Sequence, residues 1–108
     1  MTTFEAKIAA EDNHAVVWLT GDCDLAARDE MTEVLTAAVS QWHTVLVDLS
    51  QVDFLDSSGI TALVAAYQAA DQYGGDFFVV NPTEMVANVL DITGLSTRFR
   101  PPDGYSHG

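Results

Sequence analysis

The most constraining feature of this 108-residue sequence is a short polar turn between an apolar run and an amphipathic helix. The mostly apolar residues 52–55 lead into Asp56-Ser57-Ser58-Gly59. Apolar side chains then recur at the i, i+3, i+4, i+7 spacing of one helix face, at Ile60, Leu63, Val64, Tyr67 and Ala70. The pattern predicts a strand, a turn and a helix that ends at Gly74-Gly75, since glycine readily adopts the left-handed conformation of a helix C-terminus.

Two side chains are candidates to cap the start of this helix. Asp56 or Ser57 can accept a hydrogen bond from an unpaired backbone N–H of the first turn. Ser58 would then lie in that turn, near the positive end of the helix dipole, where a phosphate would meet backbone donors. On this pattern alone, the purely structural interpretation stays open, in which both serines only cap and start the helix.

The charge balance restricts the classes of partner. Sixteen acidic and four basic residues give a net charge of −12. Nucleic acid and anionic membrane surfaces are therefore not expected as partners, because both are bound by clustered lysine and arginine. A protein with a basic face suits this charge, although the acids could equally serve solubility alone. A single cysteine, Cys23, and the lack of a secretory or membrane-spanning segment favour a cytoplasmic protein.

Strands and helices are predicted to alternate along the rest of the chain. Apolar patterns predict strands over 3–10, 14–20, 45–49, 52–55, 76–80 and 97–99, and helices over 25–42 and from 82 to Gly94 in addition to the one after Ser58. Asp24 is the candidate N-cap of the first helix and Asn81, followed by proline, that of the last. This order predicts one α/β domain over residues 1–100, with a disordered tail over 101–108.

The residues that could support catalysis or metal binding do not form a known pattern. A serine hydrolase needs a base near its serine, and we expect His14, His43 and His107 to lie away from Ser58. Metal-ligand spacing and a phosphate-binding glycine loop are absent from the sequence. We therefore expect no enzyme activity, no metal and no cofactor. A divalent cation among Asp22, Asp24, Asp53 and Asp56 remains an alternative that nothing distinguishes from ordinary helix capping.

Four segments together resemble the single-domain STAS proteins that act as bacterial anti-sigma factor antagonists. Residues 54–60 (Phe-Leu-Asp-Ser-Ser-Gly-Ile) resemble the phosphorylation-site signature of that family, and Gly21-Asp22-Cys23-Asp24 resembles its G-E-x-D turn. Residues 45–49 resemble its central strand, and residues 91–95 its D-x-x-G-L helix ending. The resemblance extends over about residues 3 to 100 and implies a STAS-like α/β fold, in which a small mixed sheet of four to five strands is partly covered by helices.

The resemblance also implies a regulatory function. It implies an anti-sigma factor antagonist that binds an anti-sigma factor serine kinase and so regulates transcription in a stress response by partner switching. The kinase would use ATP to phosphorylate Ser58, or alternatively Ser57, and a serine phosphatase would reset the switch. The implied rim of the site consists of Asp22, Asp24, Asp56, Ser57 and Gly59. Two alternatives stay open, namely a constitutive STAS subunit of a transport or stress-signalling assembly and a nucleotide-binding sensor.

Overall fold

The computed structural model describes residues 3–102, and its centre is a four-stranded mixed sheet. The strands lie in the order β1-β2-β3-β4 and comprise Glu5–Glu11, His14–Cys23, Thr44–Leu55 and Asp76–Val80. The first two form the predicted antiparallel hairpin, whereas β2–β3 and β3–β4 are parallel pairs. The predicted mixed sheet is thus confirmed, and β3 unites the two segments 45–49 and 52–55 in one strand.

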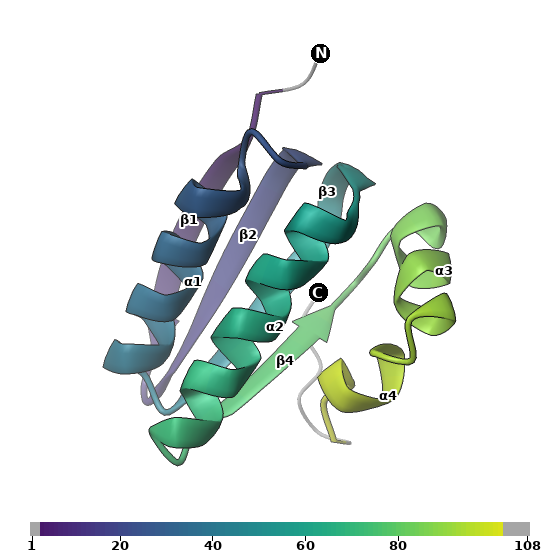
Figure 1. Ribbon diagram of the computed structural model, residues 1–108. Coiled ribbons are helices and arrows are strands. Elements are labelled where there is room, and N and C mark those ends of the chain that lie inside the picture. Colours follow the sequence, from purple (N-terminus) through teal and green to yellow (C-terminus); the bar gives the residue numbers. More distant parts are fainter. Residues whose placement is uncertain (1–2, 103–108) are drawn as a thin grey trace.

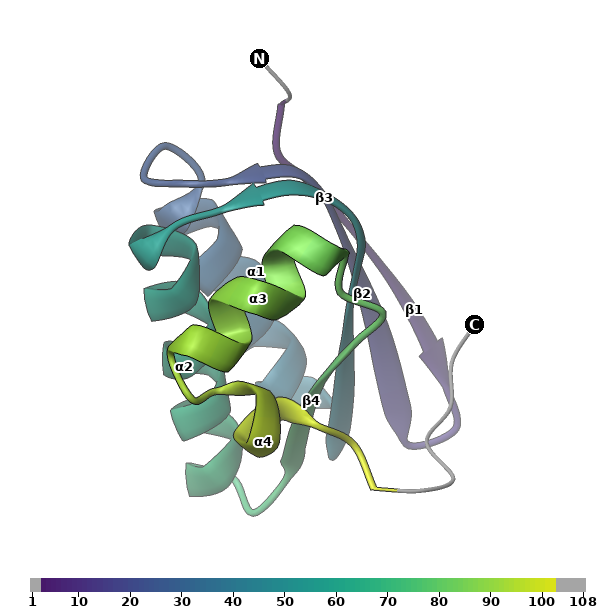
Figure 2. The same cartoon turned by 90° about the vertical axis from the view of Figure 1, so that its right-hand side faces the viewer.

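Within residues 3–102, four helices accompany the sheet, namely α1 (Arg28–Gln41), α2 (Ser57–Gln72), α3 (Glu84–Ile92) and α4 (Ser96–Phe99). Figure 1 shows α1 and α2 side by side in front of the sheet, and α3 and α4 beyond β4. Figure 2 shows the same arrangement from the side, with α1 and α2 on one face of the strands. Parallel strands require crossover connections, and here α1 connects β2 to β3 while α2 connects β3 to β4.

The main hydrophobic core lies between the sheet and the helices. Alternate strand residues face this side, because successive side chains of a strand point to opposite faces. The buried set includes Val17, Leu19, Val45, Val47, Leu49 and Phe77 from the strands and Met31, Leu35, Leu63 and Ala66 from the helices. A smaller cluster of Val16, Leu46 and Val80, with Trp18 and Phe78 packed against it, occupies the opposite face.

Two predicted helix starts were wrong. Helix α1 begins at Arg28, because Asp24 accepts the backbone N–H of Ala27 at 3.2 Å and so stabilises a turn that precedes the helix. Asn81 does not cap α3, since its backbone has φ 53° and its side-chain amide donates to Asp48 at 3.0 Å. The N-cap of α3 is Thr83, whose hydroxyl accepts the N–H of Val86.

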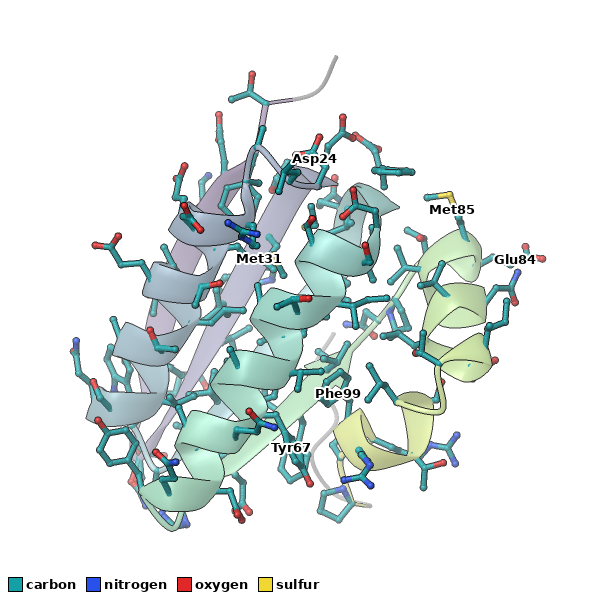
Figure 3. The ribbon with its side chains drawn as sticks, viewed as in Figure 1. Asp24, Met31, Tyr67, Glu84, Met85 and Phe99 are labelled. Atoms are coloured by element: carbon teal, nitrogen blue, oxygen red, sulfur yellow. The ribbon has the colours of Figure 1, made fainter. Side chains whose placement is uncertain are left out.

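The last predicted strand, over 97–99, was also wrong. These residues belong to α4, where Phe99 is buried and meets two aromatic rings edge to face. The ring centroids of Tyr67 and Phe77 lie 5.7 and 5.8 Å from that of Phe99. Figure 3 shows Tyr67 and Phe99 near each other. The predicted tail over 101–108 extends beyond Pro102, and residues 103–108 lie outside the described part of the chain.

Candidate modification and partner-binding site

The side chain of Asp56 determines where α2 begins. Its backbone is extended, with φ −113° and ψ −171°, and its carboxylate oxygen Oδ1 accepts the N–H groups of Ser58 at 2.8 Å and Gly59 at 3.3 Å. Its carbonyl oxygen accepts the N–H of Ile60 at 3.0 Å. Of the two candidate caps, Asp56 takes that position and Ser57 is the first residue of the helix. The predicted sequence of strand, turn and helix is therefore confirmed.

Gly59 allows the first turn of α2 to touch the end of β2. A Cβ atom at this position would clash with the backbone carbonyl oxygen of Cys23 and with Cδ1 of Leu55. The same Cys23 carbonyl accepts the backbone N–H of Asp56 at 3.3 Å. The glycine and this hydrogen bond together bring the chain around Cys23 against residues 56–59.

The aspartates predicted at the rim lie at the same edge of the sheet as the serines. Asp22 pairs with Phe54 and Cys23 with Leu55, because the carboxyl ends of the parallel strands β2 and β3 meet there. Asp24 follows directly, and Figure 3 shows it at this edge, near the start of α2. The structure thus brings together all six residues assigned to the acceptor and its rim, which are Asp22, Asp24, Asp56, Ser57, Ser58 and Gly59.

The pKa of the Cys23 thiol reflects the burial and the negative charge at this edge of the sheet. Burial raises its pKa from 9.0 to about 12, and the negative charges of Asp22, Asp24 and Asp56 act in the same direction. The side chain is completely buried, so it is a packing thiol that stays protonated at neutral pH. Three carboxylates that act on one thiol make this edge of the sheet a region of negative potential.

Exposure distinguishes the two serines. Ser57 is exposed, whereas Ser58, Asp56, Asp22 and Asp24 are half-buried. The Ser57 carbonyl accepts the hydroxyl of Thr61 at 2.8 Å, one turn further along α2. Both serines lie in the first turn of α2, at its N-terminal end.

Sequence reasoning missed two apolar residues at this edge. Leu25 and Phe54 are 64% and 44% exposed, although both are large and hydrophobic. Leu25 lies in the turn after Cys23, and Phe54 is the β3 residue opposite Asp22. The available signal was a large apolar residue next to acidic ones, since Leu25 follows Asp24 and Phe54 follows Asp53. The apolar pattern instead assigned Leu25 to the start of a helix and Phe54 to the end of an apolar strand.

The backbone donors of the first turn differ from the expectation for a phosphate at Ser58. The N–H groups of Ser58 and Gly59 are bonded to the Asp56 carboxylate, and that of Ile60 to the Asp56 carbonyl. The N–H groups that lack an intrahelical acceptor are those of residues 56–59, and three of these four are already engaged, namely those of Ser58 and Gly59 by the Asp56 carboxylate and that of Asp56 by the Cys23 carbonyl. The expected free donors are largely taken in the unmodified protein.

The histidines lie away from the serines, as far as the structure describes them. His14 begins β2 and His43 precedes β3, whereas the serines follow the other end of β3, and His107 is outside the described residues. Among residues 3–102, no group of three or more histidine, cysteine or acidic side chains is arranged to hold a metal ion. In the same part of the chain, no helix combines the length and the apolar character needed to cross a bilayer.

Comparisons with known proteins assign the fold to a family. The model of the STAS domain family matches residues 5–104. The anti-sigma-B factor antagonist of Staphylococcus epidermidis is 28% identical over 94 residues, which cover 86% of this chain and 87% of that protein.

Two solved structures are similar as well. The crystal structure of an anti-sigma factor antagonist from Mycobacterium paratuberculosis has a TM-score of 0.81 at 25% identity and covers 94% of this chain and 88% of its own. The Bacillus cell fate determinant SpoIIAA in its phosphorylated form has a TM-score of 0.70 at 19% identity, over 92% and 89% of the two chains, which is a likeness of fold. On the strength of the family match over nearly its whole length, this protein belongs to the STAS domain family.

Proposed function

We propose that this STAS protein is an anti-sigma factor antagonist that binds an anti-sigma factor serine kinase and is switched off by phosphorylation of Ser58. The observation that carries the proposal is the position of Ser58, half-buried in the first turn of α2 beside Asp22, Asp24 and Asp56. The relative from Staphylococcus epidermidis, named as an anti-sigma-B factor antagonist, supports it. In the unphosphorylated state the chain binds the kinase. Because the kinase then no longer holds its sigma factor, the sigma factor is free to direct transcription.

The surface around Ser58 has the composition of a protein-binding site. Leu25 and Phe54 offer exposed apolar area, and Asp22, Asp24 and Asp56 surround Ser58 with negative charge. Interfaces commonly combine buried apolar anchors with a polar rim, and charge complementarity accelerates the encounter. The matching face on the kinase would therefore bear basic side chains around an apolar contact.

In the phosphorylation step, Oγ of Ser58 bonds to the γ-phosphorus of ATP. The bond between that phosphorus and the bridging oxygen breaks, ADP leaves, and the hydroxyl proton passes to a base of the kinase. The chain is thus the substrate and the partner, while the kinase supplies the catalysis. Because the kinase uses ATP, we expect the exchange to take place in the cytoplasm, where a serine phosphatase would hydrolyse the phosphoserine and reset the switch.

The added charge is sufficient to release the partner. A phosphate adds nearly two negative charges at neutral pH. A like-charge contact at about 4 Å costs about 4 kcal/mol at an effective dielectric constant near 20. Each 1.4 kcal/mol changes the affinity about tenfold, so one such contact would weaken binding by nearly three orders of magnitude. The fold of residues 1–100, which we treat as one domain, need not change.

The first test is the modification itself. Intact-mass spectrometry of the protein from its native cells, with fragmentation across 53–67, should locate a phosphate on Ser58 that is lost in Ser58→Ala. A phosphate on Ser57 instead would move the acceptor by one residue. An unmodified segment under both growth and stress would favour the constitutive-subunit alternative.

The second test is partner binding. The anti-sigma factor serine kinases encoded in the same genome would be purified and titrated with wild-type protein, Ser58→Asp and the control Ser40→Asp. Ser40 is exposed near the end of α1, so its substitution adds the same charge away from the site. We expect Ser58→Asp to weaken binding and Ser40→Asp to bind as tightly as the wild type. Equal affinity of all three proteins for a kinase that binds in a stable complex would contradict the switch. In a separate titration, saturable binding of a purine nucleotide without any partner protein would favour the nucleotide-binding sensor.

A further inference from the structure

We propose that Asp56 keeps the charge of a phosphate at Ser58 uncompensated, because it holds the backbone donors that a helix N-terminus would otherwise offer to that phosphate. The inference rests on the proposed function for the choice of Ser58 as the acceptor, but it does not depend on which kinase modifies it. It makes Asp56 a positioning residue for the switch in addition to a helix cap.

The backbone N–H groups at the start of α2 are already bonded to Asp56. A phosphate at a helix N-terminus is ordinarily stabilised by unpaired N–H groups and by the helix dipole. Here Oδ1 of Asp56 lies 2.8 Å from the nitrogen of Ser58 and 3.3 Å from that of Gly59, and the Ile60 nitrogen lies 3.0 Å from the Asp56 carbonyl oxygen. A phosphate on Ser58 gains the first two donors only by displacing the carboxylate.

The charged groups near Ser58 are mainly carboxylates. Asp22 at the end of β2, Asp24 in the following turn and Asp56 before α2 all act on the buried Cys23 thiol, so their charges converge at this edge. The adjacent start of α1 carries one cation, Arg28, whose guanidinium donates to the Asp29 carboxylate at 3.2 Å. The field that a phosphate would meet is therefore dominated by carboxylates.

Competition between the Asp56 carboxylate and a phosphate on Ser58 determines whether phosphorylation raises or lowers stability. In the wild-type protein, phosphorylation should weaken the first turn of α2, since two anionic groups compete there for the N–H groups of Ser58 and Gly59. If the Asp56 carboxylate is removed, these N–H groups become free and the phosphate can take over as the cap. The effect of phosphorylation on stability should then reverse.

Thermal unfolding tests this reversal without a kinase. Phosphoserine would be genetically encoded at position 58 in three full-length proteins, which are the wild type, Asp56→Ala and the control Asp53→Ala. Asp53 is an exposed carboxylate three residues earlier on β3, so the control removes the same charge without removing the cap. We expect phosphorylation to lower Tm in the wild type and the control and to raise it in Asp56→Ala. An equal rise in all three proteins would overturn the proposal.

A second measurement applies if Asp56→Ala does not fold. Asp56→Asn keeps an oxygen acceptor for the cap but removes the charge, and a neutral amide oxygen competes less well than a carboxylate with a phosphate for the N–H groups of Ser58 and Gly59. Phosphorus NMR would follow the second ionisation of the phosphoserine, whose pKa is ordinarily near 6. We expect this pKa to be lower in Asp56→Asn than in the wild type, by about half a unit to one unit, because the nearby carboxylate disfavours the dianion.

The matched Asp53→Asn protein should show a smaller decrease of the phosphate pKa. Equal phosphate pKa values in the wild type and Asp56→Asn would overturn the proposal. Both measurements use installed phosphoserine, so they remain decisive for the role of Asp56 even if native cells never phosphorylate Ser58. An absence of Ser58 phosphorylation in native cells would contradict the proposed function but not the role of Asp56.

Discussion

The two ends of α2 are packed by the same steric device but differ in charge. At the N-terminal end, a Cβ on Gly59 would clash with the carbonyl oxygen of Cys23, and just past the C-terminal end a Cβ on Gly75 would clash with that of His43. In both places a glycine allows close approach to a strand terminus, which is the last residue of β2 at Cys23 and the residue before β3 at His43. Figure 1 shows these ends at opposite edges of the sheet.

The charges separate the two ends. Around Gly59 the nearby ionised groups are the carboxylates of Asp22, Asp24 and Asp56. Near Gly75, acidic and basic groups are mixed, since Asp71, Asp76 and Arg98 line one small pocket and His43 lies 3.7 Å from Asp76. Packing alone therefore does not mark a functional end of the helix. The one-signed charge and the half-buried Ser58 distinguish the N-terminal end.

The largest expected effect tests the common steric device. Gly59→Ala and Gly75→Ala should each lower the free energy of unfolding by about 2–3 kcal/mol, because the new methyl group meets a backbone carbonyl. The control Gly74→Ala has φ +72° but open space around the site, so we expect a cost of only about 1 kcal/mol from backbone strain. Urea denaturation measures all three. A cost at Gly59 as small as that at Gly74 would show that close packing at the N-terminal end contributes little to stability.

The second prediction concerns the pH dependence of stability that the buried thiol of Cys23 produces at the N-terminal end. The pKa of Cys23 is raised to about 12 in the folded protein, above the ordinary 9.0 that we take for the unfolded chain. Its contribution to stability is therefore complete below about pH 9 and is lost as the pH rises toward 12, by up to about 1.4 kcal/mol per pH unit. Urea denaturation between pH 8 and pH 11 should show a smaller loss in Cys23→Ala than in the wild type. Parallel pH profiles would argue against a buried thiol at this end.

A smaller effect concerns the side-chain cap at the N-terminal end of α2. Asp56→Ala should lower the free energy of unfolding by about 1 kcal/mol, because the N–H groups of Ser58 and Gly59 lose their acceptor. Asp56→Asn should retain most of this stability, and Asp53→Ala, which removes a carboxylate that does not cap, should cost less. Chemical denaturation at neutral pH provides the measurement, and equal stability of Asp56→Ala and wild type would show that the cap contributes little.

The smallest effect is expected at the opposite end. His43 and Asp76 approach within 3.7 Å, but their side chains are 57% and 51% exposed. Exposed ion pairs contribute about 0–1 kcal/mol, so His43→Gln should change the unfolding midpoint only slightly at pH 6. A loss as large as that of Asp56→Ala would show that this end also depends on specific charge contacts.

Local sequence patterns were sufficient wherever neighbouring residues settle the structure. The apolar spacing from Ile60 to Ala70 predicted α2, and Gly74, with φ 72°, lies just past its end as expected. The hairpin of β1 and β2 followed from alternation and a polar turn. Each of these features depends on residues within a few positions of one another, so one sequence contains the necessary information.

Prediction failed where distant residues compete with a local preference. Asn81 has the chemistry of a helix cap, but its side chain donates to Asp48, 33 residues earlier in the chain. A short strand was predicted at 97–99, yet Phe99 is buried against Tyr67 and Phe77 as part of a helix. In both cases the tertiary partner outweighs the local pattern.

At the candidate site, the residue types, the strand–turn–helix order and the acidic character of the surroundings could all be inferred from the sequence. The three-dimensional structure was needed to show that Asp56 rather than Ser57 caps α2 and that its carboxylate occupies the donors beside Ser58. It also decided that Gly59 lies against Cys23, which brings Asp22 and Asp24 to the same edge. These outcomes depend on contacts between strand ends that are separated by about thirty residues in the chain, and spacing along a sequence does not encode such contacts.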